Sequence, residues 1–150
     1  MKVVIQRVSK ASVEVNDEEV AAIRHGLLIL LGVEHADQDS DADWLAQKCI
    51  NLRIFGDGEG QMNLSLLDTV GEVLVVSQFT LHAQTKKGNR PSFIRAAKPE
   101  QALHLYTYFV DLLRQTIGSR VKTGIFRADM KVTLCNDGPV TIVIDSQQRE

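Results

Sequence analysis

The chain has no marked excess of charge of either sign. It contains 17 Lys and Arg residues against 19 Asp and Glu residues, which gives a formal net charge of −2. Proteins that coat long stretches of nucleic acid usually present a strongly basic face. The composition therefore argues against that class of protein, while a local basic patch remains able to bind one short nucleic-acid end.

Long apolar runs are also missing. No run approaches the roughly 20 residues of a membrane-spanning helix, and residues 1–7 are too short and too soon interrupted for a signal peptide. The two cysteines, Cys49 and Cys135, fall in different elements without C-x-x-C spacing. This pattern favours two buried thiols in a reducing compartment. We therefore expect a cytoplasmic protein with no membrane segment.

The usual signatures of metal and phosphate sites are absent. The glycine-rich segment 56–60 lacks the lysine and hydroxyl of a P-loop and precedes no clear helix, so it indicates a flexible connection. The histidines fall in separate elements with no ligand-pair spacing, at His25, His35, His82 and His104. We expect no metal and no cofactor.

What the chain does contain is an alternation of strand-like and helix-like segments. Its 150 residues, 44% of them hydrophobic, suit one globular domain. Two segments show helical spacing, one that starts within 37–43 and continues to Leu52, and one from Pro99 to Thr116 or Ile117 with Gly118 as its stop. Strand-like runs occupy 3–8, 11–15, 20–23, 27–33, 72–79, 121–126, 130–136 and 140–145. The order predicts one α+β domain over residues 1–150, with a mostly antiparallel sheet and the helices outside it.

Polar side chains end the apolar strand at 72–79, and a strand end of this kind can hold a reacting group. Within this segment, Ser77, Gln78, Phe79 and Thr80 are the candidate residues. Thr80 and His82 would point to one side about 7 Å apart, too far for direct contact without a bend or a water. No carboxylate that could orient His82 is evident. We therefore favour Thr80 as a hydrogen-bonding residue over a Thr80–His82 nucleophile pair.

The segment Gly138-Pro139 interrupts the last strand-like region. Taken alone it predicts an ordinary hairpin turn between 130–136 and 140–145. The alternative is a cis X-Pro bond, which is accessible at small energetic cost and turns the chain sharply. Such a corner could aim backbone carbonyls at an ammonium group and block a side chain sterically.

The one dense basic stretch covers 86–95 and is followed by Lys98. It is either a solvated loop or a local grip on phosphates. Phe93 in its middle would anchor the loop or stack on a base. Its candidate phosphate-binding residues are Lys86, Lys87, Arg90 and Arg95.

Several of these segments together resemble the D-aminoacyl-tRNA deacylases along essentially the whole chain. The matching runs are Ile5-Gln6-Arg7-Val8 with Ala11-Ser12-Val13, Met62-Asn63-Leu64-Ser65, Ser77-Gln78-Phe79-Thr80-Leu81, Gly88-Asn89-Arg90-Pro91-Ser92-Phe93 and Asn136-Asp137-Gly138-Pro139-Val140-Thr141. One departure stands at Phe126-Arg127-Ala128-Asp129-Met130, where that family commonly has a glycine in place of Arg127.

The resemblance implies a homodimer of barrel-like α+β subunits that binds the 3′ end of aminoacyl-tRNA. It implies that Gly138-Pro139 is cis and enters the active site of the other subunit, with Arg7 fixing the corner. The end of the strand at 77–80 would form the rest of the pocket, and Phe126 and Met130 would border the terminal adenosine.

The implied reaction is hydrolysis of the ester in D-aminoacyl-tRNA, and in glycyl-tRNA mischarged on the tRNA for alanine. The ester is already activated, so positioning and charge stabilisation suffice. The ribose 2′-hydroxyl would assist, and backbone N–H groups near Phe79 and Thr80 would stabilise the oxyanion. Corner carbonyls would hold the ammonium so that an L side chain collides with the corner. Two alternatives stay open, namely attack by Thr80 itself and a non-catalytic module that binds RNA ends or a protein partner.

Overall fold

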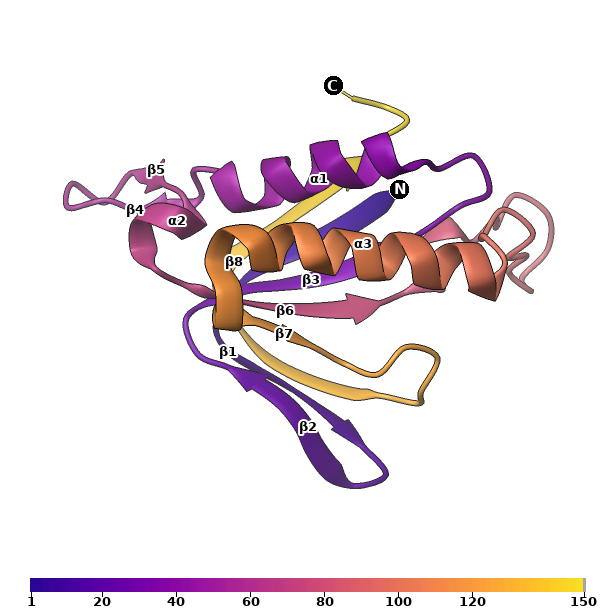
Figure 1. The fold of residues 1–150 in the computed structure, drawn as a ribbon, viewed down its shortest axis with the longest axis horizontal. Coiled ribbons are helices and arrows are strands. Elements are labelled where there is room, and N and C mark those ends of the chain that lie inside the picture. The colour runs from indigo at the N-terminus through magenta and orange to yellow at the C-terminus, as the bar shows by residue number, and fades with distance from the viewer. Residues whose placement is uncertain (150) are drawn as a thin grey trace.

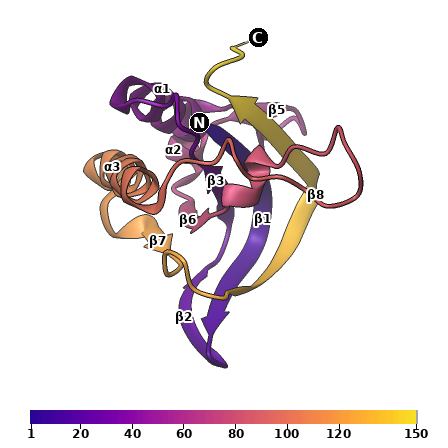
Figure 2. The same cartoon turned by 90° about the vertical axis from the view of Figure 1, so that its right-hand side faces the viewer.

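The computed structural model describes residues 1–149 and combines a six-stranded sheet with two long helices. Its elements are β1 (Lys2–Val15), β2 (Glu18–Ile23), β3 (Gly26–Gly32), α1 (Asp39–Asn51), β4 (Phe55–Gly56), β5 (Met62–Leu64), α2 (Leu66–Thr69), β6 (Glu72–Ser77), η1 (Phe79–His82), α3 (Pro99–Ile117), η2 (Gly118–Arg120), β7 (Val121–Thr123) and β8 (Lys131–Asp145). Both long helices lie on the same side of the sheet (Figures 1 and 2). The predicted α+β class is confirmed. The predicted domain ends at Glu150, which lies outside the described residues.

The sheet is mixed but mostly antiparallel, as the sequence predicted, with three antiparallel and two parallel strand pairs. Strand β1 pairs antiparallel with β2, β3 and β8, but β3 with β6 and β6 with β7 run parallel. The reason is the two long helices: α1 lies between β3 and β6 in the chain, and α3 between β6 and β7. A crossover helix carries the chain back to the end of the sheet at which the previous strand began, so the next strand runs parallel to it.

The last strand differs most from the sequence prediction. A hairpin turn at 137–139 was expected, but β8 is one strand that stays paired with β1 from Lys131 to Asp145. The register steps from Val8 opposite Asn136 to Gln6 opposite Thr141, so residues 137–140 stand opposite Arg7 alone. The Gly138-Pro139 segment is therefore a bulge in a long curved strand, which Figure 2 shows wrapping around one side of the sheet.

The core lies on both faces of the sheet. One cluster packs α1 and α3 against alternate residues of the strands, with Phe109 of α3 fully buried near its centre. A second cluster lies on the opposite face and includes Val8, Leu28 and Val76. Because β3 contributes to both clusters, its run of apolar residues has no polar alternation.

Three local expectations need correction. The strand expected over 72–79 ends at Ser77, and residues 79–82 form the 3₁₀ helix η1. The strand expected over 121–126 is limited to Val121–Thr123. Cys49 is buried as expected, but Cys135 is exposed on β8, and both thiols are free.

Candidate functional site

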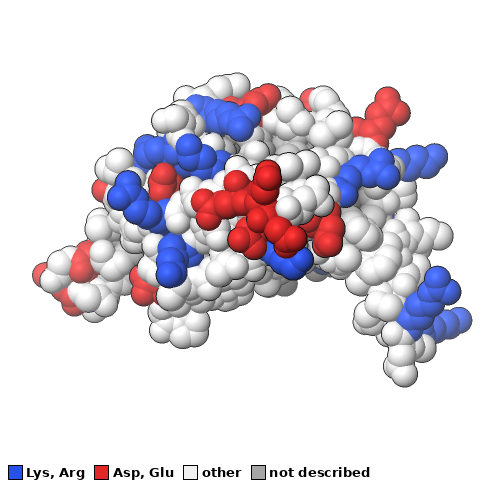
Figure 3. All heavy atoms as spheres, turned by 90° about the horizontal axis from the view of Figure 1, so that it is seen from below, with Lys and Arg blue, Asp and Glu red and all other residues white. Residues whose placement is uncertain are grey.

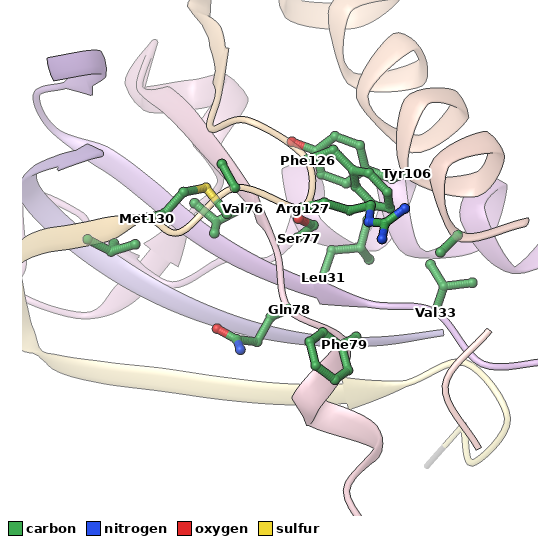
Figure 4. A pocket seen from close by; sticks show the side chains of 13 residues that line it. Leu31, Val33, Val76, Ser77, Gln78, Phe79, Tyr106, Phe126, Arg127 and Met130 are labelled. Carbon is green, nitrogen blue, oxygen red and sulfur yellow. The ribbon is translucent and has the colours of Figure 1, made fainter. Parts of the chain in front are cut away.

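A pocket of about 250 Å³ opens between the end of β6, strand β3, helix α3 and the segment before β8. It unites Ser77, Gln78 and Phe79 with Phe126 and Met130, residues that lie about fifty positions apart in the chain. Figure 4 shows these side chains around one cavity. The rest of the lining is mostly apolar and comprises Leu31, Val33, Val76, Ala102, Tyr106, Arg127, Ala128 and Val132. Thr80 does not line this pocket.

The end of β6 lies at the pocket because it packs closely against Leu31 and Gly32 of β3. The backbone N–H of Gln78 donates to the carbonyl of Leu31 at 2.8 Å. At Gly32, an added Cβ would lie 2.9 Å from the Gln78 carbonyl oxygen and 3.1 Å from the His82 ring. Contacts that short are not tolerated against backbone, so Gly32 keeps the start of η1 against the sheet.

Two backbone N–H groups at the start of η1 are available to a ligand. The first intrahelical bond there is donated by Leu81 to the carbonyl of Gln78, at 3.2 Å. Within residues 1–149, the N–H groups of Phe79 and Thr80 donate to no protein acceptor. Both residues are exposed, and Phe79 lines the pocket.

Thr80 and His82 do not form a pair. The Thr80 hydroxyl accepts a hydrogen bond from the side-chain amide of Gln78, which agrees with the hydrogen-bonding role expected for it. His82 is buried, and its Nδ1 lies 3.9 Å from a carboxylate oxygen of Glu34. The expectation that no carboxylate lies near His82 is therefore wrong. Glu34 was missed because only the β3–β6 pairing brings it there.

The far wall of the pocket is aromatic. The rings of Tyr106 and Phe126 lie 5.6 Å apart at an angle of 41°. The hydroxyl of Tyr106 donates to the carbonyl of Val75 at 3.2 Å, and burial raises the pKa of Tyr106 to about 12. Tyr106 is therefore a neutral, fixed wall residue at physiological pH.

Phe126 is presented by a tight turn. The backbone N–H of Ala128 donates to the carbonyl of Ile125 at 3.2 Å, and Arg127 has φ 66°. A positive φ at the third position of such a turn favours glycine. Arg127 therefore adopts the backbone conformation that a glycine would adopt more easily, and the turn keeps its shape.

The Gly138-Pro139 peptide bond is cis, and Arg7 supports it. The Arg7 guanidinium donates from Nε to the carbonyl of Asp137 at 2.8 Å and from Nη1 to the carbonyl of Ile54 at 2.6 Å. Gly138 has φ 137°, and a Cβ added to it would lie 2.8 Å from Nη2 of Arg7. The contact between Arg7 and the corner, expected from the resemblance, is present.

Three residues that the sequence analysis did not single out complete the corner. The side-chain oxygen of Asn136 accepts from the backbone N–H of Val140 at 3.0 Å, and its Nδ2 donates to Gln6. The hydroxyl of Thr141 also donates to Gln6, at 3.1 Å. The sequence signal was available, since Gln6, Asn136 and Thr141 belong to the runs that flank Arg7 and Gly138-Pro139.

The corner and the pocket are separate within one chain. Neither Arg7 nor Gly138 nor Pro139 belongs to the pocket lining. Gly138 and Pro139 are exposed on β8, which pairs only with β1 within residues 1–149. The candidate residues of the pocket thus lie together, and so do those of the corner, but the two groups are separate within one chain.

The basic stretch at 86–95 forms a loop next to the pocket, the basic loop. Gln84 and Ser92 exchange backbone hydrogen bonds of 2.8 and 3.0 Å across it, and the ring of Phe93 contacts that of Phe79 at 5.1 Å. Phe93 therefore anchors the loop, one of the two roles considered for it. Lys86, Lys87 and Arg90 are exposed, which leaves their charges available to a ligand.

Arg95 differs from the other basic residues of this stretch, because its guanidinium binds Glu34 at 2.6 Å.

Seen from below, the molecule carries Lys and Arg side chains toward both ends and a group of acidic side chains in the middle (Figure 3). A polyanion on this face would therefore meet separated basic areas rather than one continuous basic surface.

Residues 1–149 contain no group of three or more His, Cys, Asp or Glu side chains placed to hold a metal ion. None of the helices in that range is both long and apolar enough to cross a bilayer.

Known proteins with similar sequences indicate one family. A family model described as D-Tyr-tRNA(Tyr) deacylase matches residues 4–145. A D-aminoacyl-tRNA deacylase of Flavobacterium psychrophilum is 61% identical over the full length of both chains, and one of Bacteroides fragilis is 57% identical over the same extent.

Solved structures match as well. One titled c-Myc DNA Unwinding Element Binding Protein has a TM-score of 0.92 and 42% identity, covering 97% of this chain and 98% of its own. A probable eukaryotic D-amino acid tRNA deacylase shares the fold with a TM-score of 0.81 at 18% identity, covering 95% and 97%. From the family model and the full-length relatives together, the chain belongs to the D-aminoacyl-tRNA deacylase family.

Proposed function

We propose that this protein hydrolyses the ester that joins a D-amino acid to the terminal ribose of tRNA. The observation that carries the proposal is that one pocket combines two features. One is the segment 77–79 at the end of β6, where the N–H group of Phe79 has no acceptor within residues 1–149, and the other is the aromatic wall at Phe126. One part suits a reacting carbonyl and the other suits a nucleobase. Family membership gives the substrate class.

The terminal adenosine enters between Phe126 and Met130. An apolar cavity with aromatic rings suits the face of a base, and stacking on such rings contributes about 1–3 kcal/mol per base. The pocket volume of about 250 Å³ is of the order that a base and part of its ribose need. Binding there brings the 3′ ester to the end of β6, because Ser77, Gln78 and Phe79 line the same cavity.

The chemistry then needs little from side chains. A water molecule attacks the ester carbonyl, with the ribose 2′-hydroxyl assisting, and the products are the free amino acid and tRNA. The N–H groups of Phe79 and Thr80 donate hydrogen bonds to the carbonyl oxygen and stabilise the negative charge that develops on it. One donor of this kind typically contributes a factor of about 10²–10³ to the rate. Thr80 has its hydroxyl engaged by Gln78 and acts by orientation.

Chiral selection is assigned to the Gly138-Pro139 corner of a second subunit. The corner is exposed, is hydrogen-bonded by Arg7, and does not line the pocket of its own chain. A homodimer in which β8 lies at the interface would bring it to the partner's pocket. Its carbonyls would hold the substrate ammonium, so that an L side chain meets the corner and a D side chain points away. Glycine has no side chain to reject, so glycyl-tRNA mischarged on the tRNA for alanine would also be hydrolysed.

The remaining contacts are with the RNA backbone. Lys86, Lys87 and Arg90 stand exposed beside the pocket and would bind phosphates of the acceptor end. Arg95 would contribute charge at the base of this loop while it remains bound to Glu34. A protein that acts on charged tRNA works where tRNA is charged and used, which makes the cytoplasm its expected location.

The test of this function compares D-tyrosyl-tRNA and L-tyrosyl-tRNA with the purified protein, without added metal. Rapid loss of the D ester alone is the expected result, and glycyl-tRNA should be cleaved as well. Equal loss of both esters would make the protein a general esterase and would remove the role given to the corner.

A second candidate is binding of nucleic acid without hydrolysis. The similar structure at 42% identity carries the name of a DNA-binding protein, and the basic loop would serve such a role equally well. Binding of uncharged tRNA together with full retention of the aminoacyl group on D-tyrosyl-tRNA would favour this candidate over the hydrolase.

A further inference from the structure

Among the described residues 1–149, Arg127 is the only charged one that lines the pocket. It is exposed, and Figure 4 shows its side chain running beside the rings of Phe126 and Tyr106. All other lining residues are apolar or uncharged. Arg127 therefore makes one side of the pocket favourable for an anion.

The local structure does not explain why an arginine occupies this position. At φ 66° any residue with a Cβ is less stable than glycine in the same conformation. Within residues 1–149 the Arg127 guanidinium makes no hydrogen bond and no ion pair, so no polar contact among the described residues offsets that cost. A guanidinium is always cationic and carries five N–H donors in a planar fork, which suits a phosphate or a carboxylate.

The chemistry of the substrate decides between these two anions. This step rests on the function proposed above. The carboxyl group of the amino acid is esterified, so an aminoacyl-tRNA has no carboxylate near its 3′ end. The anions closest to a base held beside Phe126 are the phosphodiesters that connect the terminal nucleotide to the rest of the strand.

We propose that Arg127 binds the phosphodiester on the 5′ side of the terminal adenosine. The base would occupy the apolar cavity, and the guanidinium would hold the first phosphate outside it. Phosphate contacts of this kind fix the register of a nucleic acid without reading its sequence. Arg127 is thus a positioning residue for the acceptor end, and it sets how well the ester is aligned with Phe79 and Thr80.

The test uses Arg127→Gly, which suits the local backbone and should fold at least as well as the parent protein. Arg127→Lys keeps the charge, and Lys10→Ala removes one exposed charge from β1 as a matched control. Two substrates are compared, D-tyrosyl-tRNA and the minimal ester D-tyrosyl-adenosine, which has no phosphate.

The expected result is a KM for D-tyrosyl-tRNA that rises about fivefold in Arg127→Gly and is partly restored in Arg127→Lys. The KM for D-tyrosyl-adenosine should stay unchanged in all variants. The salt dependence of tRNA affinity should fall by about 0.7 in log–log slope in Arg127→Gly, the value for one phosphate contact on a single strand. An unchanged KM for the tRNA, or an equal rise for both substrates, would contradict the phosphate contact.

A binding experiment separates this inference from the reaction. The dinucleotide cytidylyl-adenosine should bind the parent protein more tightly than adenosine does, and Arg127→Gly should lose that difference. If the parent protein shows this difference but hydrolyses neither ester, the proposed reaction is wrong while the phosphate contact stands. If the dinucleotide and adenosine bind equally to the parent protein, the phosphate contact is wrong whatever the activity.

Discussion

Gly138 is the residue on which the proposed site depends most, because its surroundings exclude a side chain. A Cβ there would lie 2.8 Å from Arg7 and 2.9 Å from Val140, at a φ of 137°. Either the Arg7 guanidinium must leave the Asp137 carbonyl or the corner must shift. Both changes alter where the corner carbonyls point.

For Gly138→Ala we therefore predict loss of most D-aminoacyl-tRNA hydrolysis with a modest loss of stability, about 1–3 kcal/mol from backbone strain at one residue. Deacylation kinetics and urea unfolding of the same preparation would measure the two effects. Full activity in a stably folded variant would remove the corner from the mechanism.

Thr80 provides a test of the opposite kind. Its hydroxyl is bound by Gln78, and no base contacts it within residues 1–149. We predict that Thr80→Ala keeps the turnover number within about threefold, whereas removal of a true nucleophile costs roughly 10⁴-fold or more. Single-turnover deacylation would distinguish these outcomes, and a loss of the larger size would establish attack by Thr80.

At the residue scale, the sequence was informative about identity and less so about geometry. The contact of Arg7 with the corner followed from the resemblance, and the structure contains it. The Glu34–His82 neighbourhood could not be found, because it depends on η1 folding back against β3. The position of Thr80 relative to His82 was also unpredictable, since the strand that would have aligned them ends at Ser77.

At the scale of elements, the short helix α2 shows how a local signal stabilises a connection that the sequence analysis overlooked. Ser65 and Asp68 form a reciprocal cap, with the Ser65 N–H and hydroxyl both donating to the Asp68 carboxylate at 2.8 Å. Both hydrogen bonds lower the pKa of Asp68, and the one from the Ser65 backbone has the larger effect. The carboxylate form is thus favoured in the folded protein.

Because the pKa of Asp68 is lower in the folded protein, its carboxylate stabilises the fold. This stabilisation is fully present above the unfolded pKa of an aspartate, about 3.9, and is lost as the pH falls through the folded-state pKa. We predict that Asp68→Asn unfolds at lower urea concentration than the parent protein near neutral pH, and that the difference shrinks on acidification to about pH 3. A difference that stays constant over this range would show that the charge of Asp68 does not contribute.

The elements themselves were largely predictable. Helix α3 begins at Pro99 and ends before Gly118, as the sequence indicated, and its buried stripe includes Leu105, Phe109 and Leu113. β8 was misread because a Gly-Pro bulge and a Gly-Pro hairpin have the same local signature. Only the pairing partner β1, at the other end of the chain, decides between them.

At the scale of the whole molecule, the notable property is that the pocket and the corner, the two halves of the proposed site, are formed separately within one chain. The pocket forms at the ends of β3 and β6, and the corner forms on β8. The motifs anticipated both halves, and the resemblance implied that the corner serves the other subunit. The residues alone could not have shown the separation within one chain, since that depends on the complete sheet. A symmetric dimer would contain each half twice and would join them across its interface.

The central claim is that the corner of one subunit completes the pocket of the other. It is tested most directly by mixing two inactive proteins. One carries Gly138→Val in the corner, and the other carries Ala128→Trp, which fills the pocket. After the subunits have been allowed to exchange, each mixed dimer would contain one intact pocket facing one intact corner.

The account predicts that D-tyrosyl-tRNA hydrolysis reappears on mixing, at about one quarter of the parent activity if subunits pair at random. Native mass spectrometry would verify that mixed dimers have formed. Mixed dimers with no more activity than the two separate variants would contradict a site shared between subunits.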